Sequence, residues 1–320
     1  MEVKRFNPEF AEAWDRFVWD SNNGTIFHTR RFLNYHPPER FRDHSLIFEQ
    51  NNKIVALMPA VERTEQGQTT LISHPGASFG GFVVGKDINL RRAFQLVDEL
   101  LDYANSHHFH KIEMTLTPIF YAWKINNYLD FALFRNGFSY RKREVSSFVT
   151  LDFSADEVLQ TFKNESRTAV RRAIKLGVAV RESEDFPTFY QILRRNLKMR
   201  HNVQPTHTLD ELIRLKNIYP ERIHLYAAYL QEQMIAGVVM FHCNPLVTLA
   251  FYISHNEDFQ QYRAVNLLFY EIFRLSIQQG FRYLDFGIFT VNMEPNWGLA
   301  RFKENFGSKG IFRDTIVKVL

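Results

Sequence analysis

The chain has 320 residues, of which 45% are hydrophobic and 23% are charged. This length is enough for about two domains of ordinary size, and the composition allows each of them to bury a hydrophobic core. The formal net charge of +4 suits an anionic small-molecule ligand. It is too small to indicate a DNA-binding protein, so we expect no DNA partner.

The sequence indicates a cytoplasmic protein. Its single cysteine, Cys243, cannot form an internal disulfide bond, which favours a reducing compartment. The most apolar stretch, 235–253, is interrupted by Asn244 and Pro245, so it predicts two strands around a turn and no membrane span. Residues 1–8 lack the apolar core of a signal peptide.

Hydrophobic spacing in the first half predicts helices and short strands. Three helices are expected: one around Phe10–Phe17, one over Thr29–Tyr35 and a strongly amphipathic one over Leu90–Ser106. A turn at Asn51–Asn52 joins the first two strands. The predicted strands are Ser45–Gln50, Ile54–Glu62, Thr69–Ser73, Gly81–Val84, Lys111–Thr115 and the residues around Ser146–Phe153.

The second half repeats this order. Helices are expected after Asp185, over Leu209–Leu215 and over Ala264–Gln278. The predicted strands are Ile223–Tyr229, Met234–His242, Leu246–Ser254, Tyr283–Gly287 and Ile311–Val319. Short segments also match between the halves at a nearly constant offset, as Lys53–Ala60 does with Gln233–Met240. Such a long-period repeat indicates two similar mixed α/β domains in tandem.

The most specific motifs lie near the end of the chain. They are Gly280–Gly287, which reads GFRYLDFG, and Asn296–Gly307, which reads NWGLARFKENFG. Together with the repeated element order, they resemble the Fem-type aminoacyltransferases and related GNAT proteins of polysaccharide biosynthesis. The resemblance implies an α/β fold of two GNAT-like acyl-CoA N-acyltransferase domains, at 1–150 and 151–320, with the active site in or beside the second. Fem-type enzymes that use tRNA often carry a helical coiled-coil arm, for which this chain has no insertion.

Three residues of these motifs are candidates for catalysis. Residues 298–306 predict a short helix, on which Lys303 lies one step from the apolar stripe; from spacing alone it could be a solvated lysine. The resemblance implies that Phe302 and Lys303 lie at the acyl-transfer site, where the lysine stabilises negative charge on the tetrahedral transition state. Asp285, on a predicted strand, could accept a proton from an attacking amine or bond backbone groups at a turn.

The segment before the helix Ala264–Gln278 is the candidate donor site. The resemblance implies that this turn holds the pyrophosphate of coenzyme A on free N–H groups at the helix start. The usual sequence there is Gln/Arg-x-x-Gly-x-Gly/Ala, whereas this chain has Gln260-Gln-Tyr-Arg-Ala264 without the glycines. We expect Gln260, Arg263 and Ala264 to contact an acyl-CoA co-substrate, with Arg263 supplying positive charge.

Basic residues on the predicted helix 164–176 are candidates for binding substrate phosphate. Arg167, Arg171 and Lys175 follow one another at helical spacing and share one face. That face either binds a phosphate-rich ligand or is a solvated basic surface.

Further substrate contacts are expected from three residues outside that helix. His201 closes a helix and is either a ligand contact or a helix-terminal cation. Tyr252, on the strand Leu246–Ser254, and Asn296, in the loop before the last helix, are the other two. The cluster His107–His110 lacks the spacing of zinc ligands, so no metal site is expected.

These residues and the resemblance predict an acyltransferase. It would move an acyl group, acetyl or longer, from acyl-CoA to an amine on a cell-envelope or polysaccharide precursor, such as a nucleotide-linked glycan. No permanently bound cofactor is expected. Two alternatives stay open: a Fem-type enzyme that uses aminoacyl-tRNA and acts on a peptidoglycan precursor, and a non-catalytic binder of an anionic glycan precursor.

Overall fold

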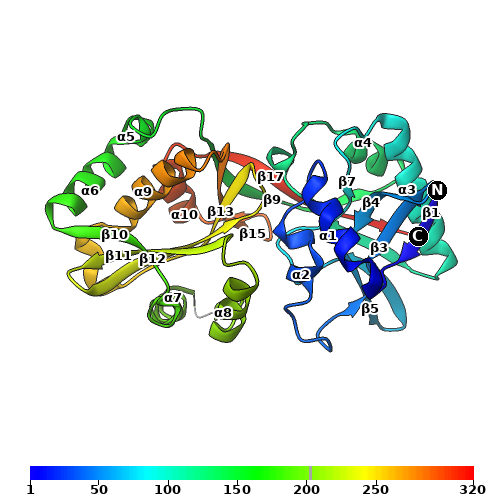
Figure 1. Cartoon of the computed structure of the whole chain (residues 1–320), viewed down its shortest axis with the longest axis horizontal. Helices are drawn as coiled ribbons and strands as arrows, with labels where there is room; N and C mark the ends of the chain where they lie inside the picture. Colours follow the sequence, from blue (N-terminus) through cyan, green and yellow to red (C-terminus); the bar gives the residue numbers. More distant parts are fainter. Residues whose placement is uncertain (202–203) are drawn as a thin grey trace. The chain divides into compact units, whose positions relative to one another are not determined.

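The chain forms two compact units. The computed structural model describes the main chain of residues 1–201 and 204–320 and the side chains of residues 1–198 and 204–320. Unit 1 contains Met1–Val145 and Phe312–Leu320, and unit 2 contains Ser146–Ile311 (Figure 1). The sequence suggested domains at 1–150 and 151–320. The end of the chain instead packs with unit 1, because its last strand pairs with a strand of that unit.

Unit 1 contains two groups of strands covered by helices. The helices are α1 (Ala11–Asp20), α2 (Arg30–Leu33), α3 (Leu90–Ser106) and α4 (Tyr128–Arg135). The first group of strands is β1 (Glu2–Arg5), β3 (Leu46–Gln50), β4 (Lys53–Met58) and β7 (Val83–Val84), in that order across the sheet. The second group is β2 (Arg42–Asp43), β5 (Ala60–Glu65), β6 (Gln68–Ser73), β8 (Lys111–Thr115) and β17 (Lys309–Val319).

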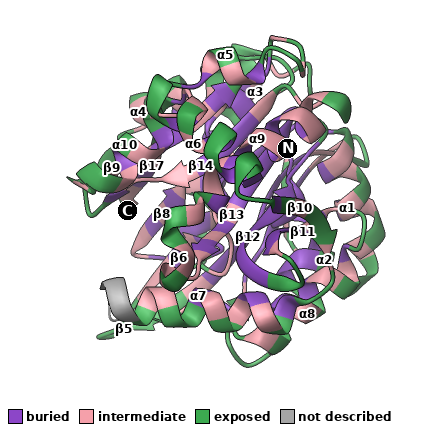
Figure 2. Ribbon diagram, turned by 90° about the vertical axis from the view of Figure 1, so that its left-hand side faces the viewer, coloured by how far each residue is buried: buried purple, intermediate pink, exposed green. Residues whose placement is uncertain are grey.

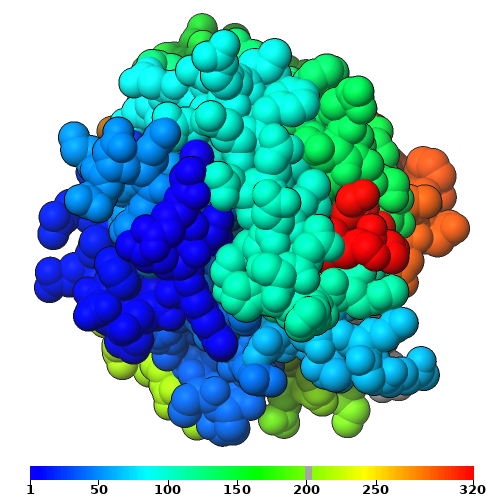
Figure 3. Space-filling model, turned by 90° about the vertical axis from the view of Figure 1, so that its right-hand side faces the viewer, coloured from blue at the N-terminus to red at the C-terminus, as the bar shows by residue number. Residues whose placement is uncertain are grey.

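The core of unit 1 lies under α3. Its apolar face, with Leu96, Val97 and Leu100, is fully buried against strand residues such as Leu46 and Ile112. The helix covers the residues that the sequence predicts, since its apolar spacing is continuous from end to end. Figure 3 shows the end of the chain, in red, lying against the surface of this unit.

One predicted strand of unit 1 is wrong. Ile54–Glu62 is not a single strand but two, β4 and β5, which belong to different sheets. The break falls at Pro59, which has no N–H to donate to a neighbouring strand. The turn at Asn51–Asn52 is confirmed: both residues have positive φ angles, of 52° and 59°, which asparagine tolerates better than most residues do.

Unit 2 is built on a mixed sheet with helices on both faces. The sheet order is β10 (Val178–Ser183), β11 (Ile223–Leu230), β12 (Gln233–His242), β13 (Val247–His255), β14 (Tyr283–Ile288) and the second part of β9 (Ser139–Thr150). The helices are α5 (Val158–Thr161), α6 (Asn164–Lys175), α7 (Phe186–His201), α8 (Leu209–Ile218), α9 (Ala264–Gln278) and α10 (Trp297–Glu304), with the 3-10 segment η4 (Glu257–Tyr262) and the short hairpin β15–β16 (Thr290–Val291 and Glu294–Pro295).

The central strands of unit 2 are buried between these helices. Helix α9 lies on one face of the sheet and α7 with α8 on the other (Figure 1), and the strands β11–β13 are mostly buried (Figure 2). Strand β12 is buried at every position after its first residue, so it is a nearly continuous apolar run. The mixed α/β fold class predicted from the sequence is confirmed.

The sheet of unit 2 opens at one place. The neighbouring strands β13 and β14 are parallel, and in the described part of the chain they pair only over Val247–Leu249 and Tyr283–Asp285. Beyond these residues β13 continues to His255, and β14 goes on pairing with β9 on its other side. A gap at the carboxyl ends of adjacent parallel strands is a common place for a ligand site.

Candidate active site

The N-terminus of α9 begins at a residue in an unusual conformation. Arg263, the N-cap of α9, has φ 56° and ψ 31°, in the left-handed region that favours glycine. It occupies the position of the first glycine in the donor-site pattern Gln/Arg-x-x-Gly-x-Gly/Ala. No side chain of the cap bonds the first N–H groups of α9. The backbone therefore makes the turn that the glycine pattern predicts, and adds a guanidinium to it.

A hollow of about 480 Å³ with many polar residues in its wall lies beside this turn. We call it the polar hollow. It is lined by Asn164, Glu165, Ser166, Thr168, Ala169 and Arg172 of α6, Arg263 and Asn266 at the start of α9, and Gly298, Arg301, Phe302 and Asn305 in and after α10. Three guanidinium groups from three helices thus share one hollow, an arrangement that suits a ligand with several phosphate oxygens.

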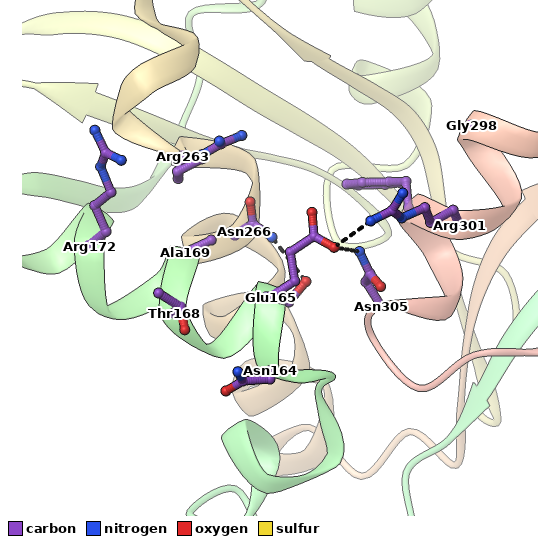
Figure 4. A pocket seen from close by; sticks show the side chains of 12 residues that line it. Asn164, Glu165, Thr168, Ala169, Arg172, Arg263, Asn266, Gly298, Arg301 and Asn305 are labelled. Carbon is purple, nitrogen blue, oxygen red and sulfur yellow. Dashed lines mark hydrogen bonds and ion pairs between the residues drawn. The ribbon is translucent and has the colours of Figure 1, made fainter.

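The side chains in the polar hollow are held by a small network. Glu165 accepts hydrogen bonds from Arg301 Nη2 at 3.2 Å and from Asn305 Nδ2 at 3.3 Å. Asn266 Nδ2 donates to Ser166 Oγ at 3.1 Å, which joins α9 to α6. Figure 4 shows Arg172 and Arg263 on one side of Glu165 and Arg301 on the other. One carboxylate therefore partly balances the three cations.

An apolar hollow of about 630 Å³ adjoins the polar one. We call it the apolar hollow. Its wall includes Asn196, Leu197, Ile235, Ile253, His255, Phe259, Gln260, Arg263, Ala264, Val265, Asn266, Asn296, Gly298, Leu299 and Phe302. Arg263, Asn266, Gly298 and Phe302 line both hollows, so the two meet at the N-terminus of α9.

Several residues expected from the sequence therefore come together. The three donor-site candidates, Gln260, Arg263 and Ala264, line the apolar hollow, as do Asn296 and Phe302. Asn296 also caps α10, because its side chain accepts a hydrogen bond from Leu299 N at 3.0 Å. Its amide is thus fixed at the rim of the hollow by the helix that it caps.

Lys303 is buried and lines neither hollow. Its Nζ donates to the carbonyl oxygens of Gly287 and Ile288, both at 2.7 Å, and only 2% of the residue is exposed. Burial lowers the pKa of its ammonium to about 7, and the nearby Asp285 carboxylate opposes that change. The lysine therefore connects α10 to the end of β14, so it is not the solvated lysine that its spacing alone would allow.

Asp285 is at the end of the segment over which β14 pairs with β13, opposite Leu249. It is buried, with 3% exposed, and accepts hydrogen bonds from Ser146 Oγ at 3.1 Å and from Gly287 N at 2.7 Å. These contacts match the alternative in which the carboxylate bonds backbone groups at a turn. Gly287 needs its glycine, since its φ is +70°.

The residues of α6 that were expected to bind substrate phosphate lie outside the polar hollow. On α6, Arg171 and Lys175 are exposed and Arg167 is half-buried, and none of them lines the polar hollow. Helix α6 presents Arg172 there instead. The face of α6 that lines the polar hollow contains Glu165, Thr168, Ala169 and Arg172, which recur at helical spacing. This spacing is visible in the sequence and could have identified Arg172.

The two remaining substrate candidates lie elsewhere. Tyr252 is buried, and its hydroxyl accepts from His207 N at 3.1 Å and lies 2.8 Å from His207 Nδ1. Burial raises the pKa of this hydroxyl to about 12. His201 ends α7, and its side chain lies outside the described residues.

Two features have no counterpart in the residues that the structure describes. No group of three or more His, Cys, Asp or Glu side chains in this part of the chain is placed to hold a metal ion. Within the same residues, no helix combines the length and the apolar character that a membrane crossing requires.

Comparison with known proteins identifies the fold. Residues 160–304 match the family model of the acetyltransferase (GNAT) domain. No curated protein matches the sequence. Among solved structures, FemX is similar with a TM-score of 0.76 at 15% identity, covering 100% of this chain and 98% of that one. L-PGS from Bacillus licheniformis is similar with a TM-score of 0.59 at 12% identity, covering 97% and 91%.

A third structure is itself a tandem. The chain is similar to a tandem GNAT protein from the clavulanic acid biosynthesis pathway, with a TM-score of 0.57 at 9% identity, covering 99% of this chain and 98% of that one. The tandem GNAT fold predicted from the sequence is thereby confirmed. The matched acetyltransferase domain lies wholly within unit 2, which holds both hollows. The prediction of an acyltransferase is also confirmed.

Proposed function

We propose that unit 2 transfers an acyl group from a coenzyme A thioester to an amine on a cell-envelope or polysaccharide precursor. The observation that carries this proposal is the meeting of the polar and apolar hollows at the N-terminus of α9, where Arg263 and Asn266 line both. A donor with a phosphate-rich head and a long, uncharged thioester arm matches two such hollows.

The head of the donor fits the polar hollow. Its phosphates would meet the guanidiniums of Arg172, Arg263 and Arg301 and the first backbone N–H groups of α9, where the helix dipole also favours an anion. The thioester arm would lie in the apolar hollow, against Ile253 and Phe302. The edge of β13 that leaves β14 can hydrogen-bond the amide groups of that arm.

The reaction is then an addition followed by an elimination. The nitrogen of the amine attacks the thioester carbonyl carbon, the tetrahedral intermediate collapses, and the thiolate of coenzyme A leaves as the nitrogen loses a proton. Lys303 would act on this step as the resemblance implies, by stabilising the oxyanion, or as a positioning residue that holds the carbonyl groups of Gly287 and Ile288 at the opening of the sheet.

Binding of acetyl-CoA measured by calorimetry tests the proposal. We expect Arg172→Ala, Arg263→Ala and Arg301→Ala each to weaken binding about tenfold, because each removes a charge-assisted contact to phosphate. Arg274→Ala is the matched control, since Arg274 is on α9 but pairs with Glu271 and lines neither hollow. Equal weakening in the control, or no binding by the wild type, would contradict the proposal.

An aminoacyl-tRNA donor is the second candidate. The similarity to FemX along the whole chain and the replacement of the donor-site glycine by Arg263 favour it. The polar hollow would then hold backbone phosphates near the 3′ end of the RNA. A competition experiment separates the two: a charged tRNA that displaces acetyl-CoA at lower concentration than the same tRNA uncharged would support the aminoacyl donor.

A further inference from the structure

A third hollow, of about 380 Å³, continues the other two. Its wall includes Asp185 just before α7, Arg195 and Asn196 on α7, Glu232 at the turn between β11 and β12, and His255 and Glu257. Asn196 and His255 also line the apolar hollow. The apolar hollow therefore shares wall residues with both of the other hollows, and all three lie within unit 2.

His255 stands at the junction of the second and third hollows. It is the last residue of β13, and its Nε2 lies 3.6 Å from the Oε2 atom of Glu257. The main chain there is fixed, because Asn196 Nδ2 donates to the carbonyl oxygen of His255 at 3.1 Å. A carboxylate at this distance from an imidazole stabilises the imidazolium that forms when the ring accepts a proton.

The charges around the third hollow suit a cationic ligand. Asp185, Glu232 and Glu257 contribute three carboxylates to its wall, against the guanidinium of Arg195. Glu232 is paired with Arg181 at 3.2 Å, and Asp185 accepts a hydrogen bond from Thr188 N at 3.0 Å. The guanidinium of Arg195 is paired with Asp258 at 3.1 Å. The balance is opposite to that of the polar hollow, where Arg172, Arg263 and Arg301 face one carboxylate. The polar hollow and the third hollow thus favour ligands of opposite charge.

We propose that the third hollow receives the primary amine of the acceptor and that His255 accepts its proton. The proposal rests on the proposed donor site. The acceptor enters as an ammonium and gives one proton to the imidazole of His255, with Glu257 stabilising the imidazolium. The neutral nitrogen then forms a bond to the thioester carbonyl carbon, the carbon–sulfur bond breaks, and the thiolate of coenzyme A takes up a proton. The amine loses two protons in all: the first goes to His255, and the second leaves the nitrogen after it has bonded to the carbonyl carbon and goes to the departing thiolate, so atoms and charge balance.

Two variants of this pair test the proposal against a matched control. His255→Gln removes the titrating group and keeps a polar side chain of similar length, and Glu257→Gln removes only the carboxylate. His224→Gln is the control, because His224 also pairs with a glutamate, Glu182, at 2.6 Å, yet lines none of the three hollows. Binding of acetyl-CoA by calorimetry is measured first for all three, which shows whether each variant is folded and holds the donor.

Acetyl transfer is then measured over pH with acetyl-CoA as donor and a panel of amines: glucosamine, glycine amide, lysine and hydroxylamine. We expect His255→Gln to keep most of its affinity for acetyl-CoA, although His255 also lines the apolar hollow, and to lose on the order of 100-fold in kcat with primary amines, together with the acidic limb of the pH profile. The loss should be smaller with hydroxylamine, which is largely unprotonated at neutral pH. Glu257→Gln should lose less of its kcat than His255→Gln does, and His224→Gln should keep the wild-type kcat. The position of the acidic limb depends on the charged groups around His255, which are Glu257 and Asp258 from η4 and Arg195 from α7.

Each other outcome decides a separate point. A His255→Gln variant with wild-type kcat and an unchanged acidic limb overturns the role of His255 and leaves the donor site standing. A wild type that binds acetyl-CoA but acylates none of the amines overturns the amine site. A wild type that does not bind acetyl-CoA overturns the proposed donor, and the inference falls with it.

Discussion

The ammonium of Lys303 lies 2.7 Å from the carbonyl oxygen of Gly287, in a place where only 2% of the lysine is exposed. The same nitrogen reaches the carbonyl oxygen of Ile288. A buried cation with two carbonyl partners fixes the end of β14 to α10, and β14 forms one side of the opening in the sheet of unit 2. Lys303, the residue that the motif marks most strongly, thus has a structural role in this arrangement: it ties α10 to the end of β14.

The first prediction follows from that tie. Lys303→Met keeps most of the side-chain volume but removes both hydrogen bonds, so the free energy of unfolding should fall by about 2 kcal/mol, as when buried carbonyl groups lose a charged donor. Urea unfolding measures it. Lys163→Met is the control, because that lysine is mostly exposed and pairs at 3.7 Å with Glu304. Unchanged stability with an approximately 100-fold lower kcat would instead support the oxyanion role that the resemblance implies.

The second prediction concerns pH. Because burial lowers the pKa of Lys303 to about 7, the unfolded chain binds this proton between about pH 7 and its ordinary pKa of 10.5 while the folded chain does not. Stability should therefore rise with pH in that window, and the contribution should be level below about pH 7. The stability difference between wild type and Lys303→Met, measured by urea unfolding at pH 7 and pH 9, should grow in favour of the wild type by at most ~1.4 kcal/mol per pH unit. A constant difference would mean that the folded protein keeps Lys303 charged throughout.

Local patterns in the sequence predicted the long helices but not strand partners. The helices α3 and α9 begin and end where the apolar spacing does, at Leu90–Ser106 and Ala264–Gln278. The strand Ile54–Glu62 was wrong because a continuous apolar run hides the change of sheet at Pro59. The last strand was predicted, but its place in unit 1 was not, since pairing with β8 depends on residues far away in the sequence.

The candidate site shows the same limit. A short motif before α9 predicted Gln260, Arg263 and Ala264, and the structure places all three in one wall. Arg172 and Arg301 were not singled out, because they meet Arg263 only when α6 and α10 pack beside α9. Spacing put Lys303 near an apolar stripe but could not show that its ammonium would be buried and would donate to main-chain carbonyl groups.

The third prediction uses the left-handed conformation of Arg263. Arg263→Gly should make the protein more stable by roughly 1 kcal/mol, because glycine adopts a φ of 56° without steric cost. The same change should weaken binding of acetyl-CoA about tenfold, because it removes a guanidinium from both hollows. Arg263→Lys should keep part of the affinity without the gain in stability. Urea unfolding and calorimetry measure the two effects, and a glycine variant that binds as tightly as the wild type would remove Arg263 from the donor site.

The fourth prediction concerns the one carboxylate of the polar hollow. Glu165 accepts hydrogen bonds from Arg301 and Asn305, and the side chains of the ion pair are 64% and 75% exposed, so the pair should contribute less than about 1 kcal/mol to stability. Glu165→Gln keeps an oxygen acceptor for both partners and removes one negative charge from a hollow that also contains three guanidinium groups.

If a phosphate-rich donor binds there, Glu165→Gln should bind acetyl-CoA several-fold more tightly than the wild type at low salt, because the anion no longer meets a like charge. The gain should shrink as salt is added, since the charges are exposed and screened beyond about 10 Å at 0.1 M ionic strength. Glu304→Gln is the matched control: that carboxylate, on α10, is 56% exposed, pairs with Lys163 at the N-cap of α6, and does not line the hollow. Calorimetric titrations at two salt concentrations give the comparison. An equal gain in both variants would reflect net charge alone, and no gain in either would place the donor phosphates away from Glu165.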